Sequence, residues 1–97
     1  MDAASDSQFR SAAFGETLVR HLVEPIVKHP DAISLQTVEG EAVVMIELVV
    51  HPDDRARVEG DKGRTLRAIR NVLSAAAGSR KATLDLVEQH GADDGAE

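Results

Sequence analysis

Apolar residues near the start of the chain recur at every fourth position, with further apolar residues beside them. This spacing places them on one face of an α-helix and predicts a helix over residues 14–28. The recurring set is Phe14, Leu18, Leu22 and Ile26, flanked by Val19, Val23 and Val27. Pro25 interrupts the pattern, because it lacks an amide hydrogen and would crowd the carbonyl of His21. The helix is therefore expected either to kink at Pro25 or to restart with Pro25 in its first turn.

Two segments with a period of two follow this helix. Residues 33–38 alternate between apolar and polar side chains, and residues 42–50 are rich in β-branched ones. This pattern predicts two strands joined by a short turn at Glu39 and Gly40. We expect alternate side chains of the longer strand to face the helices and the rest to face outward. The inward set is Val44, Ile46, Leu48 and Val50, and the outward set is Val43, Met45, Glu47 and Val49.

The second half of the chain predicts two helices and a last strand. Asp53 or Asp54 can cap a short helix that ends near residue 57 or 58, and residues 64–77 have the spacing of a longer helix. Gly78 stands where a helix-terminating glycine is expected. The expected buried side chains are Leu66, Ile69, Val72, Leu73 and Ala76 in the longer helix, and Leu84 and Leu86 in a strand over residues 81–87.

These elements follow the order α-β-β-α-α-β. We expect the helices to pack on one face of a three-stranded sheet, which makes an α+β fold. With 97 residues the chain suffices for one domain. We predict that domain over residues 13–88, with a flexible arm over residues 1–12 and a flexible acidic tail over residues 89–97. The start does not resemble a signal peptide and no apolar run is long enough to span a membrane, so the cytoplasm is the expected location.

The formal charge of −6 is unevenly distributed. Residues 55–81 include eight basic and two acidic residues, which gives this stretch +6 and leaves −12 for the rest. A partner feels mainly the charges within about 10 Å. The stretch is therefore either a basic surface for a polyanion or, as the charge alone favours, a solvated helix face beside acidic ends. Phe9 and Phe14 are the only aromatic residues, which argues against RRM and cold-shock folds, since both stack bases on aromatic side chains.

The residue types that catalysis or metal binding would need are present but lack a suitable arrangement. The four histidines, at positions 21, 29, 51 and 90, form no metal-binding pair at helical spacing, and cysteine is absent. Asp53 and Asp54 are adjacent, which is more typical of a helix cap than of a catalytic pair. Ser74 and Ser79 have no neighbouring base, and no phosphate-binding P-loop occurs. We therefore expect no enzyme activity, metal, cofactor or small-molecule substrate.

The segment Gly60-Asp61-Lys62-Gly63 joins the short helix to the long one. Glycines at both ends permit positive φ and let another backbone approach without interference from a Cβ. Amides at the start of the following helix favour a phosphate. We predict a nucleic-acid site formed by Gly60, Asp61, Lys62, Gly63, Arg64 and Arg67, with Arg57 and Arg70 at the rim and Val58 and Ile69 as apolar support.

Three stretches together resemble the KH family in its type II topology, and within it the short bacterial KhpA (YlqC-like) proteins. They are residues 22–32 (LVEPIVKHPDA), 38–41 (VEGE) and 58–70 (VEGDKGRTLRAIR), and the similarity covers residues 17–87. The resemblance places the family's loop glycines at Gly60 and Gly63, its variable pair at Asp61 and Lys62, and its next arginine at Arg64. It implies binding of about four single-stranded RNA nucleotides by an RNA chaperone or RNA-associated regulator. It also implies pairing, either with a second copy or with a larger KH protein of the KhpB type.

Two acidic residues depart from the pattern of that family. Glu59 replaces the usual isoleucine before the first glycine, and a carboxylate there must face solvent or pair with an arginine. Asp61 cancels the charge of Lys62 and opposes a phosphate. Two hypotheses follow. The first is sequence-tolerant RNA binding at weaker affinity than is typical, and the second is a KH fold kept as a protein-pairing module, with weak or no RNA binding, through Val72 or the outward face of the sheet.

Overall fold

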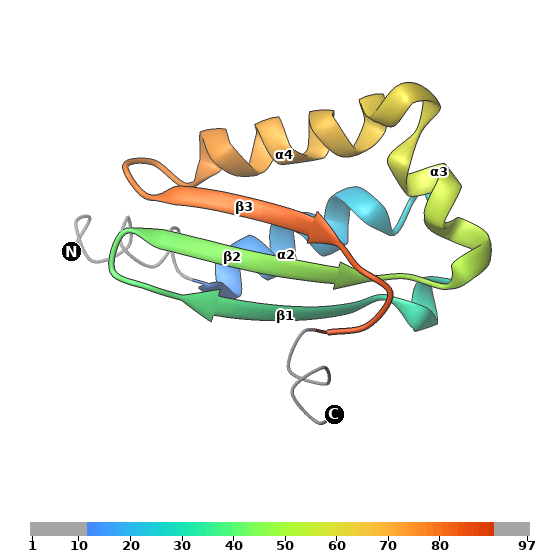
Figure 1. Cartoon of the computed structure of the whole chain (residues 1–97), viewed down its shortest axis with the longest axis horizontal. Helices are drawn as coiled ribbons and strands as arrows, with labels where there is room; N and C mark the ends of the chain where they lie inside the picture. The colour runs from blue at the N-terminus through green and yellow to red at the C-terminus, as the bar shows by residue number, and fades with distance from the viewer. Residues whose placement is uncertain (1–11, 91–97) are drawn as a thin grey trace.

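The computed structural model describes residues 12–90, which follow the expected α-β-β-α-α-β order (Figure 1). The helices are α2 (Ala12–Val23), α3 (Arg55–Glu59) and α4 (Arg64–Ala76), the strands are β1 (Ser34–Glu39), β2 (Val43–Val49) and β3 (Lys81–Leu86), and short 3₁₀ helices are η1 (Pro30–Ala32), η2 (Pro52–Asp54) and η3 (Asp61–Gly63). None of the helices described here has the length and apolarity needed to cross a bilayer. The predicted arm and tail lie mostly outside the described residues.

The central strand of the mixed sheet is β2, and the strand order is β1-β2-β3. β1 runs antiparallel to β2, with Thr37 opposite Ile46. β3 runs parallel to β2, with Leu84 opposite Ile46 on its other side. Parallel neighbours need a crossover connection, and α3, η3 and α4 provide it. The predicted nucleic-acid loop therefore lies within the crossover, beyond the end of the sheet at which β2 finishes (Figure 1).

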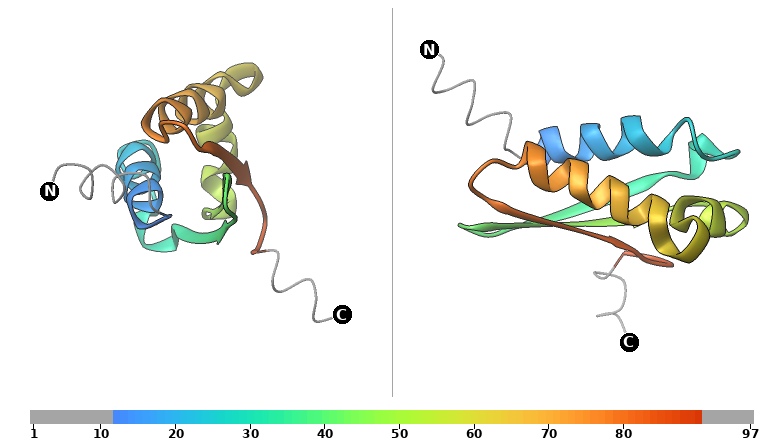
Figure 2. Two further views of the ribbon diagram at one scale, coloured as in Figure 1. Left: turned by 90° about the vertical axis from the view of Figure 1, so that its left-hand side faces the viewer. Right: turned by 90° about the horizontal axis from the view of Figure 1, so that it is seen from above.

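The core lies between the sheet and the two longer helices, which cover the same face of the sheet (Figure 2). The predicted alternation of β2 is confirmed, because its four inward side chains are at most 4% exposed whereas Met45 on the other face is 43% exposed. The buried core side chains are Val19 and Val23 of α2, Ile33 just before β1, Val44, Ile46, Leu48 and Val50 in and just after β2, Val58 of α3, Leu66, Ile69 and Leu73 of α4, and Leu84 of β3. Each such side chain stabilises the fold by roughly 1.5–3 kcal/mol relative to exposure.

Two predicted details of the helices are wrong. α2 ends at Val23 instead of residue 28, and residues 24–26 form a turn. Pro25 stops the helix because it cannot donate a backbone hydrogen bond and its ring crowds the preceding turn. Val72 was predicted in the buried stripe of α4 but is 43% exposed. It lies about a quarter turn around the helix from the centre of that stripe, where the sheet does not cover it.

One arginine joins two connections at the other end of the sheet. Arg80 Nη1 donates to Glu39 Oε2, and Arg80 Nη2 donates to the Gly40 carbonyl, both at 2.7 Å. The segment between α4 and β3 is thereby held against the tip of the β1–β2 hairpin. Gly78, in the same segment, has a φ of 71°, as expected for a residue that terminates a helix.

Candidate nucleic-acid interface

The loop between α3 and α4 begins with a glycine that packs directly against the second helix. Gly60 has a φ of 78°, in a region that favours glycine. A Cβ at Gly60 would lie 2.2 Å from Thr65 Oγ1 and 2.8 Å from Thr65 N. The Gly60 amide donates to the Ala56 carbonyl at 2.9 Å, which ends α3. The chain thus turns directly onto the first turn of α4 with no space for a side chain.

The rest of the loop is a single 3₁₀ turn that ends in left-handed backbone. The Gly63 amide donates to the Gly60 carbonyl at 3.1 Å. Lys62, with a φ of 56°, is the one non-glycine residue with positive φ in the described part of the chain, and Gly63 follows with a φ of 75°. Arg67 Nη2 donates to the Lys62 carbonyl at 3.2 Å. This bond stabilises a backbone conformation that is uncommon for lysine.

Basic side chains gather around this turn. Lys62 and Arg64 are exposed, and neither forms an ion pair with any residue among 12–90. Arg67 is also exposed and uses one guanidinium nitrogen for the Lys62 carbonyl. Arg64 is the first residue of α4, where unpaired amides carry partial positive charge. Three cationic groups and a helix start therefore surround one short loop, an arrangement suited to a phosphate.

The arginines predicted at the rim lie beside the loop and have protein partners. Arg57 Nε lies 3.7 Å from the buried Asp54 carboxylate. Arg70 Nε donates to the Leu84 carbonyl at 2.8 Å, and Arg70 Nη2 lies 3.8 Å from Asp85 Oδ1. Both arginine side chains remain almost half exposed. They can add to the local positive field, but each would bind a phosphate in competition with its present partner.

The two residues predicted as apolar support lie beneath the surface. The two acidic residues that depart from the family pattern, Glu59 and Asp61, lie on the surface. Val58 is 0% exposed and Ile69 is 5% exposed, so they support the loop from the core. Glu59 is exposed, so its carboxylate faces solvent, which is one of the two arrangements expected from the sequence. Asp61 is exposed at the start of the 3₁₀ turn, where its negative charge remains next to Lys62.

The chain is similar to a known protein family over most of its length. Residues 16–87 match the family described as KhpA/KhpB, KH domain. The chain belongs to the KhpA/KhpB family of KH domains. The match spans all the strands and reaches from α2 to just beyond β3.

Relatives from the KhpA/KhpB family align with most of the described chain. The RNA-binding protein KhpA of Halalkalibacterium halodurans is 40% identical over 75 residues, which cover 75% of this chain and 99% of that protein. KhpA of Streptomyces coelicolor is 40% identical over 73 residues, covering 75% and 91%. KhpA of Bacillus subtilis is 41% identical over 61 residues, covering 63% and 75%. No solved structure matches the chain.

In this KhpA/KhpB-family chain, the start of α3 has a buried carboxylate with distant partners. Asp54 is 0% exposed and occupies the N-cap position, but its side chain makes no capping hydrogen bond. It instead accepts hydrogen bonds from the amides of Lys28 and His29, both at 3.0 Å. Burial would by itself raise the pKa of Asp54, but these two bonds, with positive charge at His29 and Arg57, hold that pKa below its usual value. Asp54, which was predicted to cap the helix, therefore links the start of α3 to the segment after α2.

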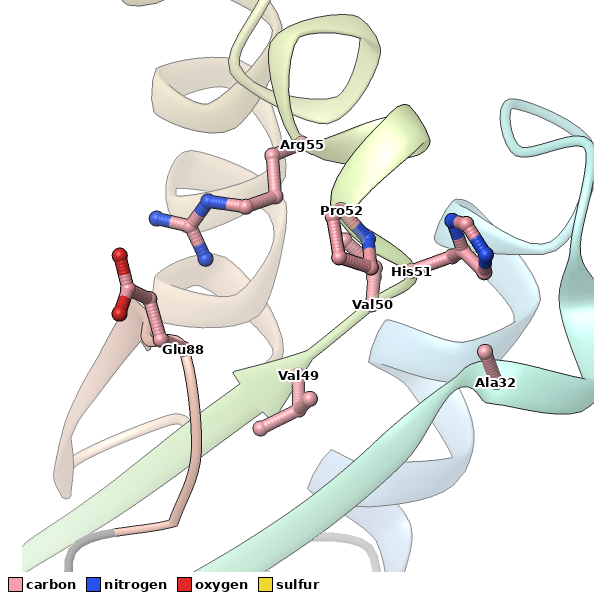
Figure 3. Close-up of a pocket in the computed structure, with 7 residues that line it drawn as sticks. All are labelled: Ala32, Val49, Val50, His51, Pro52, Arg55 and Glu88. Carbon is pink, nitrogen blue, oxygen red and sulfur yellow. The ribbon is translucent and has the colours of Figure 1, made fainter.

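A hollow of about 430 Å³ lies beside this link, at the end of β2 (Figure 3). Its lining residues are Ala32, Val49, Val50, His51, Pro52, Arg55 and Glu88. Figure 3 shows Arg55 and Glu88 on one side and His51 and Ala32 on the other. Arg55 Nη1 also donates to the Val87 carbonyl at 3.0 Å. Because α3 has five residues and so spans about 8 Å, the hollow and the loop lie near its opposite ends.

His29 and His51, to which no sequence pattern assigns a role, lie side by side where the segment after α2 meets the segment after β2. The ring centroids of His29 and His51 are 4.0 Å apart, with the rings stacked at 23°. With Asp53 they form a group whose potential metal-ligand atoms all lie within 4.8 Å of one another. No sequence spacing indicates this pair, because His29 follows α2 and His51 follows β2. Only the folded chain brings the two connections side by side.

Proposed function

We propose that this protein binds single-stranded RNA with little sequence selectivity, through residues 60–63 and the first turn of α4. The observation that carries the proposal is the loop itself. Gly60 packs without a side chain against Thr65, and the exposed Lys62 and Arg64 lie beside the start of α4. Membership of the KhpA/KhpB family supports it, since the relatives are named RNA-binding proteins.

The proposed mechanism begins with the phosphate backbone. One phosphate would accept hydrogen bonds from amides at the start of α4, with the cationic groups of Lys62, Arg64 and Arg67 around it. Because these contacts are made to the backbone, they position the RNA without reading its sequence. Residues 60–67 include no aromatic side chain, so this segment provides no platform for base stacking. Weak, sequence-tolerant contact would suit an RNA chaperone or RNA-associated regulator working in the cytoplasm.

The test is fluorescence anisotropy of labelled single-stranded RNA between about 50 and 200 mM salt. We expect the wild type to bind with an affinity that falls steeply as salt rises. Lys62→Asp should weaken binding at least about tenfold and lower the slope of log affinity against log salt by about 0.7 for each phosphate that is no longer neutralised. Lys81→Asp is the matched control, because it makes the same charge change on an exposed residue beyond the far end of α4.

Two results would contradict this proposal. One is an absence of binding by the wild type even at the lowest salt. The other is an equal loss of affinity in Lys62→Asp and Lys81→Asp, since that result would assign binding to general charge and not to the loop. Circular dichroism of each variant distinguishes weaker RNA binding by a folded protein from unfolding.

An apolar surface favours a second function, the pairing of this chain with another copy. A hollow of about 210 Å³ runs between the end of α2 and the first turns of α4, and it is lined by Leu22, Ile26, Thr65, Ala68, Ile69 and Val72. Val72, at 43% exposed, stands at its edge. In a symmetric dimer the same patch is used by both copies. A larger KH protein of the KhpB type is the alternative partner, and light scattering of a mixture of the two proteins distinguishes it from a second copy of this chain.

A further inference from the structure

A group of potential metal ligands lies where the connection after α2 meets the connection after β2. His29 Nε2 lies 3.9 Å from Asp53 Oδ2, and His51 Nδ1 lies 3.7 Å from the same oxygen. We propose that His29, His51 and Asp53 bind a divalent transition-metal ion of the zinc class, with water completing its coordination. This site lies beyond the opposite end of α3 from the RNA-binding loop and does not depend on RNA binding.

The donor atoms suit this class of ion. Two imidazole nitrogens and one carboxylate oxygen are a common ligand set for Zn²⁺ and its first-row neighbours. In a tetrahedral site with bonds of about 2.0 Å, neighbouring donor atoms lie about 3.3 Å apart. The two nitrogens lie 3.9 and 3.7 Å from the Asp53 oxygen, about half an ångström beyond that value, and all the potential ligand atoms lie within 4.8 Å of one another. Rotation of the three side chains would close these gaps. Mg²⁺ and Ca²⁺ prefer sites made of oxygen ligands, so this site should discriminate against them.

The fold holds the backbones of both histidines in place. Asp54, which is completely buried, accepts a hydrogen bond from the His29 amide at 3.0 Å. His51 is the N-cap residue of η2, just after the central strand. A proline follows each of the two histidines in the sequence, and a residue before proline has fewer backbone conformations available to it. The His29 and His51 side chains are 43% and 38% exposed, so an ion can reach rings whose main chain is already positioned.

Metal binding would change two contacts of the present arrangement. A nitrogen lone pair lies in the plane of its ring, so the His29 and His51 rings, now stacked at 23°, must rotate until their planes meet at the ion. His51 Nδ1 now accepts a hydrogen bond from the Asp53 amide at 3.0 Å. This hydrogen bond shows that a lone pair of His51 Nδ1 points toward Asp53. A bound ion would accept that lone pair in place of the amide hydrogen. The Asp53 side chain is 74% exposed, so it is free to turn toward the ion, and water would replace His51 as the partner of the released amide.

A bound ion would add a link between two connections that Asp54 already holds together. It would therefore stabilise the folded state by an amount that grows as the free ion concentration exceeds the dissociation constant, because the unfolded chain does not hold the three ligands together. The effect should appear as a rise in the melting temperature with added Zn²⁺, and no rise with the same concentration of Mg²⁺.

The experiment uses the full chain without an affinity tag, stripped with a chelator and titrated with ZnCl₂ by calorimetry. We expect one ion per chain, and at least about tenfold weaker binding in each of His29→Gln and His51→Gln. His21→Gln is the matched control, because His21 is an exposed histidine on α2. In a two-dimensional NMR spectrum, Zn²⁺ should shift the Asp53 amide resonance as its bond to His51 is broken.

Three outcomes would overturn the proposal. The first is that the wild type binds Zn²⁺ no more tightly than the His29→Gln, His51→Gln double variant. The second is that Zn²⁺ does not shift the Asp53 amide resonance. The third is that light scattering shows the ion binding only between two chains. Melting curves in chelator confirm that each variant is folded, so a loss of zinc binding reports on the ligands.

Discussion

Gly60 is subject to two constraints, and Gly63 to only one. Both have positive φ, at 78° and 75°. A Cβ at Gly60 would also lie 2.8 Å from the backbone nitrogen of Thr65, whereas the nearest atom to a Cβ at Gly63 is Arg67 Nη2 at 3.9 Å. The shape of the loop therefore depends more on Gly60, although the sequence motif presents the two glycines as equivalent.

Alanine substitutions separate these constraints. We expect Gly60→Ala to reduce the free energy of unfolding by about 3 kcal/mol, because backbone strain adds to displacement of the first turn of α4. Gly63→Ala should cost about 1 kcal/mol, because it introduces strain alone. Urea unfolding followed by circular dichroism measures both values. Equal losses in the two variants would show that the contact with Thr65 relaxes without cost.

The residues that could be predicted from sequence are those whose role depends on local spacing. Gly60 and Gly63 belong to one short motif between two helices, and the observed backbone explains why glycine stands at each position. The contact between His29 and His51 joins two distant connections, and no local pattern indicates it. Asp54 matched a capping pattern, but its carboxylate binds amides that lie 25 and 26 residues earlier.

Among the elements, α3 depends most on its attachments. A helix of five residues is not stable by itself in water. The Asp54 carboxylate ties its start to Lys28 and His29, and Arg55 ties it to the Val87 carbonyl. Since α3 leads into the loop, these bonds also position Gly60.

Replacing Asp54 tests this dependence. We expect Asp54→Asn, in chelator at pH 7, to lower the melting temperature by more than about 5 °C, because one amide oxygen cannot replace two carboxylate oxygens that accept buried hydrogen bonds. The lowered pKa of Asp54 means that its ionised form stabilises the fold above the unfolded-state pKa of about 3.9. This contribution is lost as the pH falls through the lower, folded-state pKa. The gap between wild type and variant should therefore narrow in strong acid, and a gap that is independent of pH would contradict the explanation.

Hydrophobic periodicity predicted the type and order of the elements but was less accurate at their margins. The alternation in β2 indicated correctly which side chains enter the core, because a buried sheet face allows one register only. The apolar pattern of α2 continues past Pro25, but the helix does not, because proline removes a backbone donor whatever the side chains nearby can bury. Val72 extends the apolar stripe of α4 to a part of the surface that the sheet does not cover.

For the molecule as a whole, the α+β arrangement could be predicted because each element has one apolar face and the connections are short. Its assembly with other chains depends on surfaces, which the same patterns describe poorly. The hollow between α2 and α4, with Val72 at its edge, is the surface on which the proposed pairing rests.

Val72→Glu tests this surface. We expect light scattering over a dilution series to show a dimer for the wild type and a monomer for the variant, since pairing would bury the added charge. Asn71→Glu is the matched control, because it adds the same charge at an exposed neighbouring position of α4. A wild type that stays monomeric at every concentration would exclude pairing with a second copy.

The parallel pairing of β2 with β3 has a consequence for synthesis of the protein. Val43 pairs with Lys81, and Leu48 pairs with Leu86, so the sheet joins segments that leave the ribosome far apart in time. A nascent chain that has exposed only β1 and β2 can form a hairpin, but Leu84 is not yet available to complete the core. Non-local pairing of this kind is slow compared with local contacts. The loop that we propose for RNA therefore emerges before the strand that closes the fold around it, and it should gain its binding shape only after translation has passed β3.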